Sequence, residues 1–148
     1  MQQLTLPQIQ SMTPQALDRV YALEQYTRTL PQEWIETRHV IHAGVYARTI
    51  EIKAGVLLTG VFIKIPTTLI VSGDVTVYTG GEAKRISGYH VLAAAAGRKQ
   101  VFLAHLDTQL TMVFATGETD LDRIEAQFTD EVELLMSHGM GNTVVKGD

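Results

Sequence analysis

The feature that most constrains this chain is a succession of short β-type runs between Arg38 and Ala115, punctuated by glycines. Each run is rich in β-branched or aromatic residues, and no helical pattern separates one run from the next. Regular short strands of this kind favour an antiparallel sandwich or barrel. The predicted strands are His39–His42, Val45–Ile52, Leu57–Ile65, Thr68–Ser72, Val75–Thr79, Lys84–Ile86, Tyr89–Ala93, Val101–His105 and Leu110–Phe114.

Glycine-containing connections set the expected strand boundaries. Ser72-Gly73-Asp74 and Thr79-Gly80-Gly81-Glu82 are typical of tight turns, because glycine accepts a positive φ at little cost. Ser87-Gly88 also stands in a turn context between two runs. The sequence therefore predicts separate strands on either side of each of these glycines.

A short helix is expected before the β-type region. Thr13 and Pro14 are typical of an N-cap followed by proline at the first helical position. Apolar residues then recur at helical spacing to about Thr29, and Pro31 closes the helix. This stripe contains Leu17, Val20, Tyr21 and Leu23. Residues 1–37 are thus predicted to form an N-terminal helical arm, irregular at both ends.

The pattern becomes helical again over residues 117–139. One apolar stripe faces a strongly acidic remainder, with seven acids and one base between residues 118 and 133. The stripe contains Leu121, Ile124, Phe128, Val132, Leu135 and Met136. Thr119 is the expected cap, Thr129 the start of a second helical segment, and Gly139 the stop.

The apolar stripe of this acidic, amphipathic segment has two interpretations. It packs either on the chain's own barrel or against a neighbouring subunit, which would make the stripe an interface. The acids are most simply a solvated face. Residues 140–148 are expected to form a small polar tail, so residues 38–116 are the barrel of one folded domain with two helical flanks.

Composition excludes several classes of function. The 148 residues suit a single domain, and the absence of cysteine excludes disulfide scaffolds, cysteine-based zinc sites and thiol chemistry. The net charge is −4, and the densest basic spots are only Lys84-Arg85 and Arg98-Lys99, so nucleic-acid binding is not expected. The first ten residues lack the features of a signal peptide, and no apolar run is long enough to span a membrane.

Two glycine-containing blocks resemble the conserved halves of a cupin. The first runs from Ala54 to Val77, and the second is Ala95-Ala96-Gly97-Arg98-Lys99-Gln100. Residues 39–135 are also similar to small cupin-like proteins of bacteriophages and prophages, which tend to end in a helix like Thr129-Asp130-Glu131. The resemblance implies a mainly β, cupin-like antiparallel barrel or jelly roll, with an N-terminal helix and a C-terminal acidic helical segment.

The metal ligands that the resemblance implies are missing from this chain. Cupin metal sites use a His-x-His pair, a nearby glutamate and a later histidine. Ile63 and Ile65 stand where the pair would fall, and Gln100 stands at the later histidine position. No acid occurs between Glu51 and Asp74. We therefore expect no metal, no cofactor and an apolar barrel interior, with Ile63 and Ile65 pointing inward.

Candidate site residues are correspondingly few. His39 and His42 are three residues apart on a strand and should face opposite sides, so they are not expected to share a metal. No serine stands in a nucleophile motif, and no catalytic residue is nominated. A ligand at the barrel mouth would meet Arg48, Lys64, His90 and Gln100.

Two classes of function follow, with a third that spans both. The first is a non-catalytic structural or assembly protein, phage-associated, which contacts itself or other subunits of an assembly. The alternative is a metal-independent cupin that binds a small molecule. The third is a phage factor that counters a host protein or signalling molecule. The expected location is the cytoplasm of the bacterial host, the virion, or both.

Overall fold

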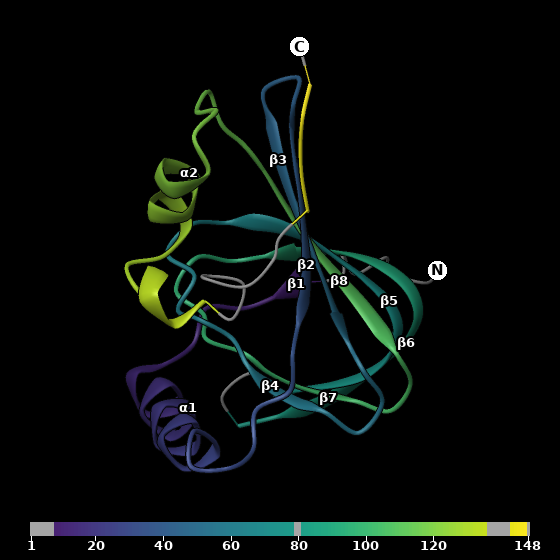
Figure 1. The fold of residues 1–148 in the computed structure, drawn as a ribbon. Helices are drawn as coiled ribbons and strands as arrows, with labels where there is room; N and C mark the ends of the chain where they lie inside the picture. Colours follow the sequence, from purple (N-terminus) through teal and green to yellow (C-terminus); the bar gives the residue numbers. More distant parts are fainter. Residues whose placement is uncertain (1–7, 79–80, 136–142, 148) are drawn as a thin grey trace, which may run out of the picture.

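A computed structural model describes residues 8–78, 81–135 and 143–147. In this part of the chain, strands account for most of the regular structure and helices occur near either end (Figure 1). The elements are β1 (Gln8–Ile9), α1 (Pro14–Thr27), β2 (Glu36–His42), β3 (Val45–Ile52), β4 (Leu57–Thr59), β5 (Thr67–Tyr78), β6 (Ala83–Ala94), β7 (Val101–Ala104), β8 (Thr108–Ala115), α2 (Leu121–Phe128), the 3-10 helix η1 (Val132–Leu134) and β9 (Thr143–Lys146).

The long strand β5 joins two sheet layers. Residues Thr68 to Ser72 of β5 pair with β8, whereas Val75 to Tyr78 pair with β7. The strand order is β1-β6-β5-β8-β3-β2-β9, and β7 with its neighbour β4 branches from the second half of β5. Every pair formed among the strands from β2 through β8 in chain order is antiparallel. The expected mainly β, barrel-like arrangement is therefore confirmed.

Strands β5 and β6 cross between the layers at a pair of glycines. Gly73 lies opposite Gly88 in the β5–β6 ladder, and both have positive φ, at 145° and 95°. The predicted turns at Ser72-Gly73-Asp74 and Ser87-Gly88 are therefore wrong. Two facing residues without a Cβ let both strands bend together while the ladder continues from Thr67 to Tyr78.

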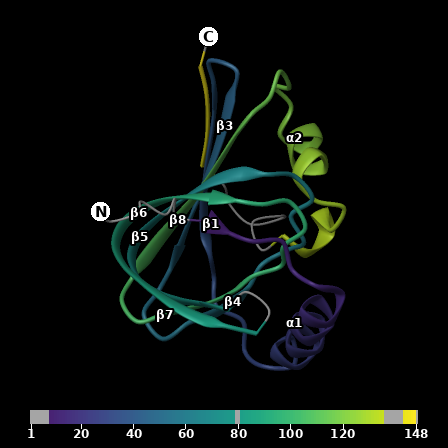
Figure 2. The same cartoon turned by 180° about the vertical axis from the view of Figure 1, so that it is seen from behind.

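Three hydrophobic clusters hold the described chain together. The largest fills the barrel, with Val71, Val75 and Leu110 among its fully buried members. The second joins the barrel to α2 and η1 through Tyr46, Ile124 and Phe128, and a third packs α1 against Val101. Both helices lie on the same side of the barrel in the two opposite views (Figures 1 and 2).

The N-terminal helix forms as predicted. Thr13 is the N-cap, its side chain accepts a hydrogen bond from the Ala16 amide, and Pro14 occupies the first turn. The helix ends at Thr27. The residues before it are less irregular than expected, because β1 pairs in parallel with Ala93 and Ala94 of β6.

The C-terminal segment departs from its prediction in two places. The cap of α2 is Asp120 rather than Thr119, since the Asp120 carboxylate accepts from the Asp122 amide. Thr129 ends α2 with extended backbone and starts no second α-helix; only the short η1 follows. The predicted stop at Gly139 lies outside the described residues.

The expected tail and the expected limits of two strands also need correction. The tail is not wholly irregular, because β9 pairs in parallel with Arg38 to Ile41 of β2. Strand β2 begins at Glu36, so the proposed boundary at residue 38 falls inside a strand. Beyond β4 the run to Ile65 leaves the ladder and keeps a single bridge, between Ile63 and Arg98.

No helix in the described ranges is both long enough and apolar enough to cross a membrane.

Candidate functional site

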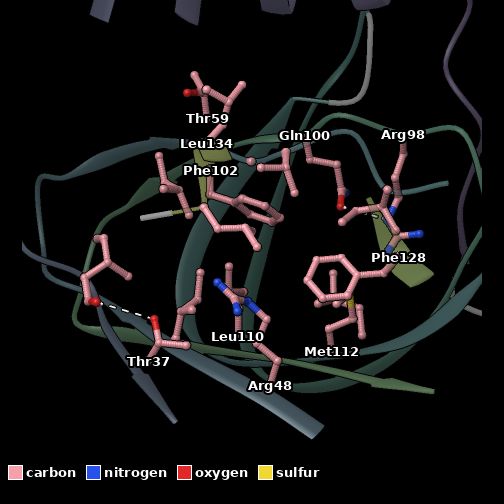
Figure 3. Close-up of a pocket in the computed structure, with 18 residues that line it drawn as sticks. Thr37, Arg48, Thr59, Arg98, Gln100, Phe102, Leu110, Met112, Phe128 and Leu134 are labelled. Carbon is pink, nitrogen blue, oxygen red and sulfur yellow. Dashed lines mark hydrogen bonds between the residues drawn. The ribbon is translucent and has the colours of Figure 1, made fainter. Parts of the chain in front are cut away.

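The barrel contains a pocket to which the C-terminal segment contributes Phe128, Leu134 and Leu135. Its volume is about 120 Å³, and most of its wall is aliphatic or aromatic. The charged residues among the described lining are Arg48 and Arg98, and no acid is among them. The lining consists of Ile35, Thr37, Arg48, Ile50, Leu58, Thr59, Gly60, Val61, Ile63, Leu69, Arg98, Gln100, Phe102, Leu110, Met112, Phe128, Leu134 and Leu135 (Figure 3).

Arg48 reaches the pocket from β3. Its guanidinium forms an ion pair with Glu125 of α2, with 3.6 Å between Nη1 and Oε2, and both side chains are at least nine-tenths buried. The guanidinium carbon also lies 5.8 Å from the centre of the Phe128 ring. Arg48 therefore ties α2 to the barrel while its head group borders the cavity (Figure 3).

Arg98 is buried just before β7, with 1% of its surface exposed. Its guanidinium donates to the carbonyls of Ala95 and Ile65, to Oγ1 of Thr67 and to Oε1 of Gln100. None of these acceptors is a carboxylate, and no ion pair to Arg98 occurs within the described ranges. Burial lowers the pKa of Arg98 to about 10, so the group remains a cation at neutral pH.

Gln100 lines the same cavity and carries a buried hydrogen-bond donor without an acceptor among the described residues. Its Oε1 accepts from Nε of Arg98 over 3.2 Å, which fixes the orientation of the amide. Its Nε2 is buried and has no hydrogen-bond partner among the described residues. A buried amide donor without a partner costs about 1–3 kcal/mol, so an acceptor that entered the pocket would remove that penalty.

A buried ionic cluster, here called the clasp, holds the two helical flanks against the barrel. It consists of Lys99, Glu24 of α1 and Glu131, which precedes η1. Nζ of Lys99 lies 3.0 Å from Glu24 Oε2 and 3.2 Å from Glu131 Oε1. Glu131 also accepts hydrogen bonds from the Phe62 amide and the Tyr21 hydroxyl. The clasp thereby joins the barrel to both helical flanks.

The contacts around Glu131 shift two pKa values. Burial by itself raises the pKa of Glu131, but the Phe62 amide, the Lys99 ammonium and the Tyr21 hydroxyl outweigh it and leave that pKa below its ordinary value. Burial and the neighbouring Glu131 carboxylate raise the pKa of Tyr21 to about 12. At neutral pH the hydrogen bond from Tyr21 to Glu131 therefore joins a neutral hydroxyl to a carboxylate.

The structure brings together only two of the four residues expected at a ligand mouth. Arg48 and Gln100 border the pocket. Lys64 instead points to the surface, where it pairs with Asp130 over 2.6 Å. His90 lies on an exposed position of β6 and bonds to the Ser87 carbonyl. Neither residue lines the pocket, because the chain leaves the ladder near Lys64 and because His90 lies at an exposed part of β6 near the bend at Gly88.

The apolar stripe expected as an interface is covered by the chain itself. Ile124 and Phe128 are completely buried and Leu135 nearly so, all within the cluster that joins α2 to the barrel. Leu121 and Val132 are partly buried against the same cluster. These side chains are therefore not a surface for a neighbouring subunit, and Met136 lies outside the described residues.

The four histidines that the structure describes do not gather into a site. His39 is buried and its Nδ1 lies 2.7 Å from the Tyr46 hydroxyl, whereas His42 is exposed, so the prediction that they face opposite sides is confirmed. His105 lies on the surface with its Nε2 2.6 Å from Thr76 Oγ1.

The residues in the pocket do not suit a metal ion. Ile63 and Gln100 both line the pocket, and Ile65 packs against the α2 cluster, so the Ile pair does lie inward. Over the described ranges, no three His, Cys, Asp or Glu side chains lie close enough together to hold a metal. The two guanidinium groups would also repel a cation.

Sequence reasoning missed the charged residues that the barrel buries. Arg98 and Lys99 were noted only as one of the two densest basic spots of the chain, yet 1% and 0% of their surfaces are exposed. A usable signal was their place in an otherwise apolar stretch directly before β7. Their partners Glu24 and Glu131 lie far away in the sequence, so the ion pairs themselves had no local signature.

The sequence matches no protein-family profile and no curated protein sequence. Three-dimensional comparison with solved structures does give similarities. One is to ectoine synthase from P. lautus, at 18% identity over 66% of this chain and 75% of that one, with a TM-score of 0.50. Another is to KdgF from Halomonas sp., at 19% identity over 61% and 87%, with a TM-score of 0.49.

A third similarity is to an RmlC-like cupin family protein with a double-stranded β-helix fold from Methanocaldococcus jannaschii. It has 11% identity over 59% of this chain and 84% of that one, with a TM-score of 0.47. Identities this low bear on the fold alone. The expected mainly β, barrel-like fold with an N-terminal and a C-terminal helix is confirmed by the elements and strand pairing of the described chain.

Proposed function

We propose that this chain binds a small organic molecule in the barrel pocket without a metal ion. The observation that carries the proposal is Gln100, which lines the cavity and whose buried Nε2 donor has no acceptor among the described residues. A polar group placed in an otherwise apolar wall is the usual means by which a binding pocket orients its ligand.

The size of the cavity limits the ligand. At about 120 Å³ it is slightly smaller than an apolar cavity of about 150 Å³ that accommodates benzene. A ligand of about six non-hydrogen atoms matches that space, whereas a nucleotide or a sugar chain would require the C-terminal segment to move away.

A fragment screen by NMR tests this proposal. The panel contains neutral, anionic and cationic compounds of about six non-hydrogen atoms, and binding is followed by amide chemical shifts of Gly60, Gln100 and Phe102. We expect at least one compound to shift these amides and to lose its effect in Ile63→Trp, whose larger side chain occupies the cavity. Val91→Trp, on an exposed position of β6, is the matched control and should bind normally. A panel without any binder would contradict the proposal.

Assembly through protein contacts is the second candidate, and β6 is the feature that favours it. In the described chain β1 covers only Ala93 and Ala94 of β6, so the edge from Ala83 to Leu92 has unpaired backbone groups. Tyr89 and Val91 on this stretch are 68% and 49% exposed. Such an edge is suited to strand pairing with another subunit, including a subunit of a phage particle.

Light scattering at micromolar concentration tests the assembly candidate. We expect an oligomer for the unmodified chain and a monomer for the Val91→Lys variant, because a charge on an edge strand discourages pairing. The matched control Val145→Lys, on β9, should leave the oligomer intact. A monomer for the unmodified chain, together with its absence from purified phage particles, would eliminate this candidate.

A further inference from the structure

We infer that the ligand of the barrel pocket is a small carboxylate with a branched apolar body, held by Arg98 and Gln100. This inference rests on the proposed binding function and adds the chemical class of the ligand. It follows from the charge of the pocket, from the donors that border it and from its size.

The charge of the pocket is the first argument. Two guanidinium groups line the cavity and no described acid does. Glu125 accompanies Arg48 at 3.6 Å, but the hydrogen bonds of Arg98 in the described chain all go to neutral oxygens. A buried cation surrounded only by dipoles is costly, and an anion that arrives beside it supplies the missing counter-charge.

The arrangement of donors is the second argument. A guanidinium has five N–H groups, and four hydrogen bonds from Arg98 are accounted for in the described chain. Gln100 adds an N–H group without an acceptor and is joined to Arg98 through its Oε1. A carboxylate has two oxygens that accept from neighbouring donors, so it matches this pair better than a single hydroxyl or carbonyl does.

The apolar wall is the third argument. Leu58, Phe102 and Met112 border the rest of the cavity, and they offer no donor to a second polar group. The body of the ligand should therefore be aliphatic and compact. Isobutyrate, which has six non-hydrogen atoms, is a suitable probe for a cavity of about benzene size.

The inference is tested with three compounds of similar shape: isobutyrate, isobutyramide and isobutylamine. Binding is measured by titration calorimetry and by the Arg98 Nε–H resonance in NMR spectra. We expect isobutyrate to bind at least about tenfold more tightly than isobutyramide, because ionic hydrogen bonds are about twice as strong as neutral ones. Isobutylamine should not bind.

Two substitutions at Gln100 leave the Arg98 guanidinium in place. They distinguish the effect of a competing carboxylate from the loss of one hydrogen-bond donor. Gln100→Glu puts a carboxylate beside Arg98 and should abolish isobutyrate binding, whereas Gln100→Leu removes only one donor and should weaken it about tenfold. If isobutyramide binds as tightly as isobutyrate, the carboxylate inference is overturned while the proposed binding function stands. If none of the three compounds nor any fragment of the wider panel binds, both are overturned.

Discussion

Nζ of Lys99 lies 3.0 Å from Oε2 of Glu24, and this buried ion pair joins the barrel to α1. The Lys99 side chain has no exposed surface, and only 9% of the Glu24 side chain is exposed. A second carboxylate, from Glu131, approaches the same ammonium at 3.2 Å and brings in the C-terminal segment. One cation thus organises both segments that flank the pocket.

Removal of this cation should strongly destabilise the fold. In Lys99→Met, the buried Glu24 keeps only its half-exposed partner Arg28 and the partly buried Glu131 loses its ammonium partner, and we expect a loss of about 3–5 kcal/mol in the free energy of unfolding. Chemical denaturation monitored by circular dichroism measures this loss.

The matched control for this experiment is Arg28→Met. Arg28 also pairs with Glu24, over 3.3 Å, but half of its side chain is exposed, so its removal should cost less than about 1 kcal/mol. A triple variant that combines Lys99→Met with Glu24→Gln and Glu131→Gln should recover part of the lost stability. Equal effects for Lys99→Met and Arg28→Met would mean that the clasp adds nothing beyond a surface ion pair.

Tyr21 and Tyr46 should ionise only well above pH 10. Burial raises the pKa of both Tyr21 and Tyr46 to about 12, with a further contribution from the Glu131 carboxylate at Tyr21. Each folded-state value lies above the ordinary value of 10.0, so the stability that these hydroxyls contribute is complete below pH 10 and is lost as pH rises toward 12.

Absorbance at 295 nm as a function of pH measures this titration. Part of the absorbance change should appear only as pH approaches 12, from Tyr21 and Tyr46. Tyr46→Phe should reduce this late change, whereas Tyr89→Phe, at an exposed position of β6, should leave it unaltered. Absence of any late change would contradict the burial of Tyr21 and Tyr46.

The bend in β5 requires glycine at position 73. A Cβ at Gly73 would lie 2.8 Å from the Cα of Thr108 and would also clash with the Thr108 side chain. The φ of 145° adds backbone strain for any other residue. We expect Gly73→Ala to lower the free energy of unfolding by about 2–4 kcal/mol, since strain and overpacking each cost about 1–3 kcal/mol.

Gly55→Ala separates strain from steric clash. Gly55 has a φ of 85°, but a Cβ there would meet nothing within 4 Å. Its substitution should therefore cost only the backbone strain, about 1–2 kcal/mol. If both alanine variants unfold at the same denaturant concentration, the close approach of β5 to Thr108 is not a constraint on this fold.

Several elements of the fold followed from local sequence. Strand β3 was predicted with its observed limits, Val45 and Ile52, because a glycine precedes it and β-branched residues fill it. The cap of α1 at Thr13 was predicted because a proline, which favours the first turn of a helix, follows it directly. The sequence could not show whether Gly73 lies in a bent strand or in a turn, because glycine permits positive φ in either structure. Only the continuous ladder between β5 and β6 identifies a bent strand.

The candidate site was only partly predictable. The alternation around Ile63 and the replacement of a histidine by Gln100 indicated an apolar, metal-free interior, and both residues do border the pocket. The burial of Arg98 was not predictable, because its acceptors include carbonyls of Ile65 and Ala95 that are aligned only once the barrel has formed. Every residue has a backbone carbonyl, so the sequence does not indicate which carbonyls will accept from a buried arginine.

Restoring histidines at the cupin ligand positions should not restore tight metal binding. In the variant that combines Ile63→His with Ile65→His, only the first imidazole would border the pocket, since Ile65 packs against the α2 cluster instead. The two guanidinium groups in the wall would oppose a divalent cation, and no described acid lines the cavity. Calorimetric titration with zinc and nickel should therefore give dissociation constants weaker than about micromolar. Ile63→His with Gln100→His is the sharper comparison, because both positions border the pocket; nanomolar affinity in either variant would mean that the charge of the pocket does not govern what it binds.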